Sequence, residues 1–177
     1  MKDIKRRIKS VGSTRQITKA MELVSSSKLR KAKQRAEQAR PYFNELYKSM
    51  CEIASANTDF STVFTQKREI KHRLFIVVAG DRGLAGGYNS NVLKQAEAQQ
   101  GPVTVLPIGK RSQEYFAHHG ADLFTEEVLL AADVSVGECF ALSRKITEGY
   151  LKGDYDAVKL CYTRFDSMMT QTAVTME

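Results

Sequence analysis

The sequence predicts an α/β protein: a long N-terminal helix of coiled-coil type, followed by a Rossmann-like three-layer domain with a mostly parallel sheet. Three observations support this prediction. Apolar residues recur at three- and four-residue steps over residues 2–56, and short apolar runs alternate with helical stretches from residue 73 onward. The charge is also divided, since residues 1–40 carry thirteen Lys or Arg and three acidic residues, whereas the rest carries fourteen basic and seventeen acidic residues.

The first predicted element is one helix from Lys2 to about Ala56, which only Gly12 and Pro41 could interrupt. Pro41 lacks an amide donor and should kink or bend the helix. At 1.5 Å rise per residue the helix would be about 80 Å long, whereas an α/β domain built from the remaining residues would be roughly 30 Å across. The domain cannot cover such a helix, so we expect the helix to lie inside a larger assembly.

One narrow apolar stripe follows this helix, and its other faces carry Lys, Arg, Gln and Ser. Such a stripe is typical of a helix that forms half of an antiparallel coiled coil. The basic residues around it predict a partner with acidic groups, namely protein carboxylates, nucleic acid or anionic lipid. The predicted shaft seam consists of Ile4, Ile8, Val11, Ile17, Val24 and Leu29.

Residues 57–70 lose the helical periodicity and are predicted to be a connector, so that residues 71–177 form the α/β domain. Leu74–Ala79 is a short run of branched apolar residues, suited to a strand buried on both faces. The glycine-rich stretch that follows predicts a turn, and Tyr88–Gln99 predicts a helix. Val103–Ile108 is the second predicted strand, and Gly109 turns the chain into a helix over Lys110–His119.

The second half of the domain repeats this alternation with weaker signals. Ala121–Phe124 is a third and weaker strand, Val134–Lys152 a helix, and Ala157–Tyr162 a fourth strand; Gln171–Thr175 could be another. No apolar run approaches the ~18 residues of a membrane span. Because the chain stops without any segment that could pair with the N-terminal seam, we expect it to be a fragment.

The turn Asp81-Arg82-Gly83-Leu84-Ala85-Gly86-Gly87-Tyr88-Asn89 follows a buried strand and opens a helix. Such a position can bind phosphate. However, the glycine spacing is not G-x-G-x-x-G, and no acidic residue is placed to hold a ribose. The Gly109-Lys110-Arg111-Ser112 stretch lacks the earlier glycine of a P-loop. A structural or partner-contacting turn is therefore the preferred interpretation, with nucleotide binding as the alternative.

The sequence shows no catalytic residues, no metal site and no cofactor. The histidines, His72, His118 and His119, have no second ligand type at helical spacing. The three widely spaced cysteines fit a reducing compartment rather than a disulfide framework or a zinc site. Basic residues on the long helix could contact nucleic acid, but the apolar seam shares the same stretch, so we expect no nucleic-acid partner.

The long helix and the glycine-rich turn both resemble the gamma subunit of F-type ATP synthases. The matching stretches of the helix are residues 17–24, 27–32 and 40–42, and residues 81–89 resemble the signature after the first strand of that family's domain. The likeness covers the entire chain. The family's long C-terminal helix is missing, so this chain corresponds to roughly the first 60% of such a subunit.

The resemblance implies a non-catalytic central-stalk (rotor) subunit without cofactors, which couples proton flow to ATP synthesis or hydrolysis. Its partners would be the alpha and beta subunits, the epsilon subunit and the proteolipid ring. It would be peripheral on the cytoplasmic face of a bacterial plasma membrane. The signature turn would comprise Asp81, Arg82, Gly83, Leu84, Gly86, Gly87 and Asn89.

Within the helix, we expect Lys19, Met21 and Glu22 to make the coupling contact with the catalytic subunits. Met21 is neutral and flexible, so it can slide past carboxylates. A lysine there would form an ion pair that is too strong and would weaken coupling. The alternative function is a small nucleotide-binding α/β protein with a basic coiled-coil arm, and a basic-helix nucleic-acid binder is a third hypothesis.

Overall fold

The computed structural model describes residues 2–56, 62–66, 68–98, 101–132 and 134–177. The chain divides into two units, Met1–Thr65 and Gln66–Glu177. Residues 57–61 and 67 of the predicted connector lie outside the described residues, as does Gln99, the predicted end of the second helix.

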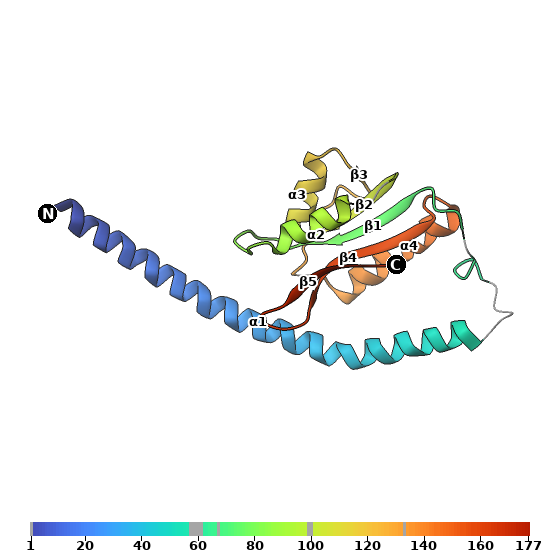
Figure 1. The fold of residues 1–177 in the computed structure, drawn as a ribbon, viewed down its shortest axis with the longest axis horizontal. Helices are drawn as coiled ribbons and strands as arrows, with labels where there is room; N and C mark the ends of the chain where they lie inside the picture. The colour runs from blue at the N-terminus through green and yellow to red at the C-terminus, as the bar shows by residue number, and fades with distance from the viewer. Residues whose placement is uncertain (1, 57–61, 67, 99–100, 133) are drawn as a thin grey trace. The chain divides into compact units, whose positions relative to one another are not determined.

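The first unit is built on α1, a single helix over Lys2–Ala56, as predicted. It runs without a break through Gly12 and Pro41, and Figure 1 shows it bowed along its length rather than broken. Hydroxyl groups in the middle of the helix bond to the backbone one turn earlier, for example Thr18 Oγ1 to Thr14 O at 2.9 Å. These bonds satisfy the hydroxyl groups without requiring another element.

The second unit contains a five-stranded sheet in the order β3-β2-β1-β4-β5. The strands are β1 (Arg73–Val78), β2 (Val103–Ile108), β3 (Asp122–Leu123), β4 (Ala157–Phe165) and β5 (Gln171–Met176). All neighbours pair parallel except β4 and β5, which are antiparallel and joined by a hairpin. The predicted fold class, with its mostly parallel sheet, is confirmed.

Helices cover both faces of this sheet (Figure 1). On one face α2 (Tyr88–Glu97) and α3 (Lys110–His118) pack against a core that includes Phe75 and Val77. On the other face α4 (Val136–Lys152) packs against a second cluster around Leu74 and Leu106. Successive side chains of a strand point to opposite faces, and both sets are apolar in β1, which explains the unbroken apolar run.

Several boundaries differ from the predicted ones for local reasons. The helix α4 begins at Val136 rather than Val134 because Ser135 and Glu138 form a capping box: Ser135 Oγ accepts from Glu138 N at 3.2 Å, and Glu138 Oε2 accepts from Ser135 N at 2.7 Å. The strand β4 extends beyond Tyr162 because β5 pairs with it up to Phe165. None of the helices in the described part of the chain has the length and apolar character that a bilayer crossing requires.

Candidate functional site

The apolar seam of α1 is solvent-exposed along its whole length. Its side chains are between 38% and 68% exposed, with Leu29 the least and Val11 the most exposed. Exposed apolar side chains on this scale mark an interaction surface in most soluble proteins. The members of this seam are Ile4, Ile8, Val11, Ile17, Val24 and Leu29, and Met21, at 53% exposed, lies among them.

The seam does not run straight along the helix axis. The step from Val11 to Ile17 is six residues, which moves the stripe about 120° around the axis at 3.6 residues per turn. A partner that followed the apolar side chains would therefore contact one side of the helix near Ile8 and another near Val24. The surface is asymmetric, although the residue types along it are similar.

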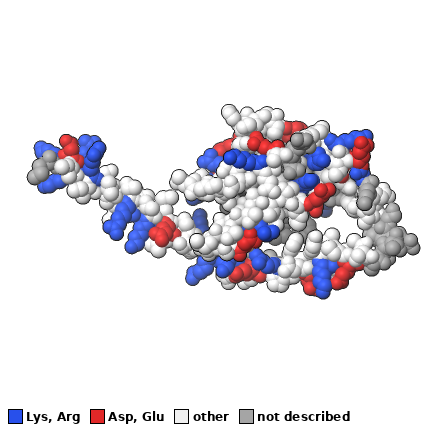
Figure 2. All heavy atoms as spheres, in the orientation of Figure 1, with Lys and Arg blue, Asp and Glu red and all other residues white. Residues whose placement is uncertain are grey.

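Most basic side chains of α1 form no ion pair with any residue that the structure describes, and Figure 2 shows mostly Lys and Arg along the N-terminal half of the helix. Within residues 2–40, Lys33 is the single basic residue in an ion pair, with Glu37 at 3.6 Å. The remaining charges are free to meet carboxylates of a partner.

The three predicted coupling residues do not share one face of α1. Lys19 and Glu22 line a shallow groove together with polar residues of the same helix and with Val11 of the seam. Met21 instead follows Ile17 by four residues and precedes Val24 by three, which places it on the seam. The structure thus brings Lys19 and Glu22 together and places Met21 on a different face.

In the second unit, the signature turn between β1 and α2 is organised around the carboxylate of Asp81. This carboxylate accepts three backbone hydrogen bonds: Oδ1 from Lys110 N at 3.1 Å and from Ala131 N at 3.0 Å, and Oδ2 from Ala132 N at 3.0 Å. The residue therefore ties the turn to the first residue of α3 and to the loop that precedes α4.

These bonds also change the acidity of Asp81. Partial burial disfavours the carboxylate, but the N–H groups of Ala131, Ala132 and Lys110, together with the charge of Arg82, outweigh burial and lower the pKa of Asp81 below its ordinary value. The carboxylate is therefore ionised at neutral pH and sits at the N-terminus of α3, where an anion is favoured. A protein carboxylate thus occupies the position at which a phosphate would bind.

The rest of the signature turn presents its backbone and one apolar side chain to solvent. Asn89 Oδ1 accepts from Gly80 N at 2.8 Å and closes the turn from the α2 side. Gly86 has a φ of 56°, and Leu84 has a φ of 60° although it is not glycine. Leu84 is 97% exposed. A non-glycine residue in this region is uncommon, and strained exposed residues of this kind often belong to contact sites.

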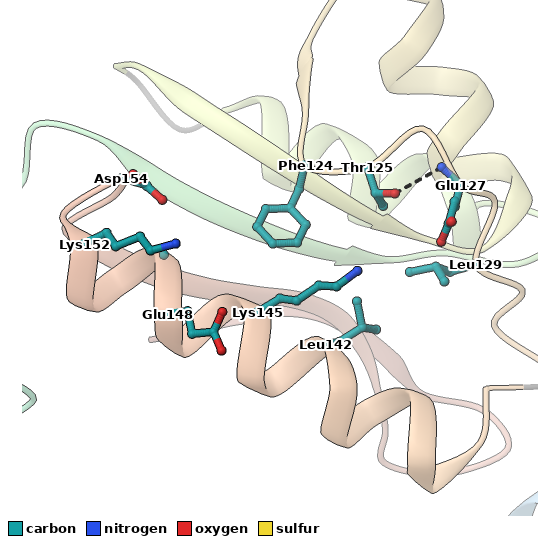
Figure 3. Close-up of a pocket in the computed structure, with 10 residues that line it drawn as sticks. Phe124, Thr125, Glu127, Leu129, Leu142, Lys145, Glu148, Lys152 and Asp154 are labelled. Carbon is teal, nitrogen blue, oxygen red and sulfur yellow. Dashed lines mark hydrogen bonds between the residues drawn. The ribbon is translucent and has the colours of Figure 1, made fainter.

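Sequence reasoning missed a groove of about 320 Å³ between α4 and the loop that follows β3 (Figure 3). Phe124, Leu129 and Leu142 supply apolar side chains to it, and Thr125 Oγ1 accepts from Glu127 N at 3.1 Å. None of the charged side chains around it is in an ion pair within the described residues. They are Glu127, Lys145, Glu148, Lys152 and Asp154. Apolar side chains flanked by charged ones of both signs are a lining that suits protein contact.

The described residues also contain no cluster of three or more His, Cys, Asp or Glu side chains that could hold a metal ion. His72 bonds to Thr104 at 2.9 Å, and His119 Nδ1 lies 2.7 Å from the carbonyl oxygen of Tyr115. Cys51 and Cys139 are exposed, whereas Cys161 is buried.

Comparison with known proteins agrees with these features. The ATP synthase family model matches residues 1–177. The chain is 47% identical to the ATP synthase gamma chain of Ruminococcus albus, covering 97% of this chain and 62% of that one. It is 38% identical to the sodium ion specific ATP synthase gamma chain of Acetobacterium woodii, covering 100% and 60%. The chain therefore spans about 60% of the length of these relatives.

A solved structure has the same fold. The central stalk of the Tetrahymena thermophila mitochondrial ATP synthase superimposes with a TM-score of 0.72 at 20% identity, covering 90% of this chain and 70% of that one. At this identity the likeness concerns the fold. Since the family model covers all residues from 1 to 177, this chain belongs to the ATP synthase gamma chain family.

Proposed function

We propose that the chain is part of the non-catalytic central-stalk subunit of an F-type ATP synthase, coupling proton flow to ATP synthesis or hydrolysis in the alpha and beta subunits. The observation that carries the proposal is α1, a 55-residue helix with an exposed apolar seam that changes sides. Most of the basic residues around this seam form no ion pair among the described residues. A rotor must favour several similar conformations of its neighbours in turn, so it needs an asymmetric surface.

The same reasoning supports the partners of this proposal. Exposed ion pairs contribute about 1 kcal/mol or less each, which suits contacts with alpha and beta subunits that must break on every turn. The exposed Leu84 turn and the groove lined by Phe124 and Leu142 are the surfaces that we assign to contacts with the epsilon subunit and the proteolipid ring. The proposal places the complex on the cytoplasmic face of a bacterial plasma membrane.

Binding to subunits and nucleotides tests this function. The chain should form a complex with the alpha and beta subunits encoded with it, and calorimetry on the chain alone should show no tight binding of ATP, ADP or NAD. Nucleotide binding by the chain alone would favour the small nucleotide-binding α/β protein instead. A salt-dependent shift of DNA on a gel would favour a nucleic-acid binder.

The coupling contact at Lys19, Met21 and Glu22 is tested by Met21→Lys in the assembled enzyme. We expect fewer protons pumped per ATP hydrolysed, because a fixed positive charge beside partner carboxylates strengthens a contact that must break. Gln38→Lys is the matched control, since it adds the same charge to an exposed position of the same helix. Equal pumping ratios for Met21→Lys and wild type would contradict the assignment. Repeating the measurement with sodium ions would identify the transported ion.

A further inference from the structure

The strand β5 is an edge of the sheet, and its sequence lacks the usual protection of an edge (Figure 1). Residues 167–176 contain no charged residue, no proline and no glycine. Edges normally avoid pairing with other chains by carrying lysine or proline, by bulging, or by being very short. The opposite edge follows this rule, since β3 is only Asp122–Leu123 and includes an acidic residue.

The register of the hairpin shows which backbone groups of β5 face outward. Asp166 N donates to Thr170 O at 3.2 Å, which makes this pair a hydrogen-bonded one. Hydrogen-bonded and non-hydrogen-bonded pairs alternate along an antiparallel ladder. Ala173 and Thr175 of β5 therefore belong to non-hydrogen-bonded pairs, with Thr163 and Cys161 of β4 respectively. The backbone N–H and C=O groups of Ala173 and Thr175 therefore point away from β4, to the side on which another strand would add.

One side chain from α2 satisfies part of this edge. With its amide oriented to match its neighbours, Gln95 donates to Ala173 O at 2.9 Å and accepts from Thr175 N at 3.3 Å. Both bonds run to the outward-facing groups. The amide of Gln95 thus makes the two hydrogen bonds that the backbone of an added strand would make.

A partly buried chain of polar groups holds Gln95 in this orientation. Gln95 Oε1 lies 3.0 Å from Thr175 Oγ1, which in turn lies 3.4 Å from Cys161 Sγ. Burial raises the pKa of the Cys161 thiol, so the sulfur keeps its proton and can donate it to Thr175 Oγ1. The hydroxyl of Thr175 is then free to donate to Gln95 Oε1, which leaves the amide nitrogen of Gln95 directed at Ala173 O.

We propose that the outer edge of β5 is a strand-pairing surface for a second copy of this chain, and that Gln95 keeps it closed. A second copy fits because two antiparallel β5 strands form an isologous pair around a two-fold axis, in which uncharged side chains face uncharged side chains. High β-propensity without charge or proline is also the composition of segments that pair with themselves.

Removing the amide tests this inference in the full chain. Gln95→Ala should associate, by sedimentation velocity, at a concentration about tenfold lower than wild type, because two backbone groups lose their partners. Hydrogen exchange identifies the surface: the Thr175 amide should exchange slowly in wild type, rapidly in dilute Gln95→Ala, and slowly again when that variant is concentrated. Any association through α1 is common to all variants and cancels in the comparison.

Three further variants make the result specific. Gln113→Ala removes a glutamine from α3, where its amide bonds to Glu126 O away from the sheet edge, and should behave as wild type. Gln95→Met keeps the side-chain volume and should associate as Gln95→Ala does, even if the alanine variant folds poorly. Gln95→Ala with Gln171→Lys adds a lysine to the edge and should return to wild-type association. Association of Gln95→Met equal to wild type, or association without protection of Thr175, would overturn the proposal.

Discussion

The two units of this chain use apolar residues in opposite ways. In the second unit, Leu74, Phe75 and Val77 are fully buried between the sheet and its helices. In α1, apolar residues at regular helical spacing remain exposed, as Ile4 does at 61%. One sequence therefore encodes a core that is buried by the residues of its own unit and an apolar surface that stays exposed on the other unit. The regular pattern of α1 predicted the helix, and its exposed residues are the ones that we propose a partner contacts.

The largest expected effect compares a core position with a seam position. Phe75→Ala should lower the free energy of unfolding of the second unit by about 3–5 kcal/mol, because it leaves a cavity between β1 and α2. Ile8→Ala in α1 should change the stability by about 0.5 kcal/mol or less, since Ile8 is exposed. Because the chain has no tryptophan, urea unfolding can be followed by tyrosine fluorescence, which reports mainly on the second unit once Tyr42 and Tyr47 of α1 are replaced by phenylalanine in both variants. Equal losses of unfolding free energy for Phe75→Ala and Ile8→Ala would contradict the distinction between a buried core and an exposed seam.

A smaller effect is expected at glycines that position the turns of the second unit. Gly109 has a φ of 96°, and a Cβ there would lie 2.1 Å from Ala79 O. Gly153 has a φ of 85°, but a Cβ there would meet nothing within 4 Å. Gly109→Ala should therefore cost about 3 kcal/mol, from backbone strain together with the displaced strand end, whereas Gly153→Ala should cost about 1 kcal/mol.

Thermal unfolding of both variants gives the measurement. Gly109, with a ψ of 140°, lies in a backbone region that is nearly restricted to glycine, whereas Gly153, with a ψ of 20°, lies in the left-handed helical region. The difference between the two variants therefore combines this backbone strain with the close approach of Gly109 to β1. If Gly153→Ala lowered the melting temperature as much as Gly109→Ala does, the close approach of the β2–α3 turn to the end of β1 would not contribute to stability.

The same contrast explains how much of the molecule its sequence predicts. The spacing of apolar residues predicted both ends of α1 and both ends of β2, because the pattern of each element is uninterrupted. It missed the extension of β4 to Phe165, which depends on pairing with β5. It also could not find the bonds from Asp81 to Ala131 and Ala132, since these residues are fifty positions apart and no local pattern links them.

The site was less predictable than the fold for a related reason. The expected coupling residues Lys19, Met21 and Glu22 are neighbours in the chain, and the helix places Met21 on a different face from the other two. The groove beside α4 joins residues of that helix to a loop with no regular pattern. In the sequence Gln95 looks like any polar residue on a helix, and its role depends on the position of the β5 edge beside it, which only the structure gives. Contacts between distant segments decide these features.

The smallest expected effect concerns a carboxylate in each unit. Asp81 accepts three backbone N–H groups, whereas Glu22 in α1 has no hydrogen bond or ion pair within the described residues. Asp81→Asn should cost about 1–2 kcal/mol at neutral pH, because a charged acceptor is replaced by an amide with one oxygen. Glu22→Gln should have no measurable effect on stability.

The pH dependence gives the sign of the Asp81 contribution. Because the pKa of Asp81 is lowered in the folded state, the unfolded chain takes up its proton first as the pH falls. The stabilisation from the carboxylate is therefore complete above the ordinary aspartate pKa of about 3.9 and is lost as the pH falls through the lower folded value. Acid titrations of wild type and Asp81→Asn should converge in this range. Parallel curves down to the lowest pH would show that the charge of Asp81 does not stabilise the signature turn.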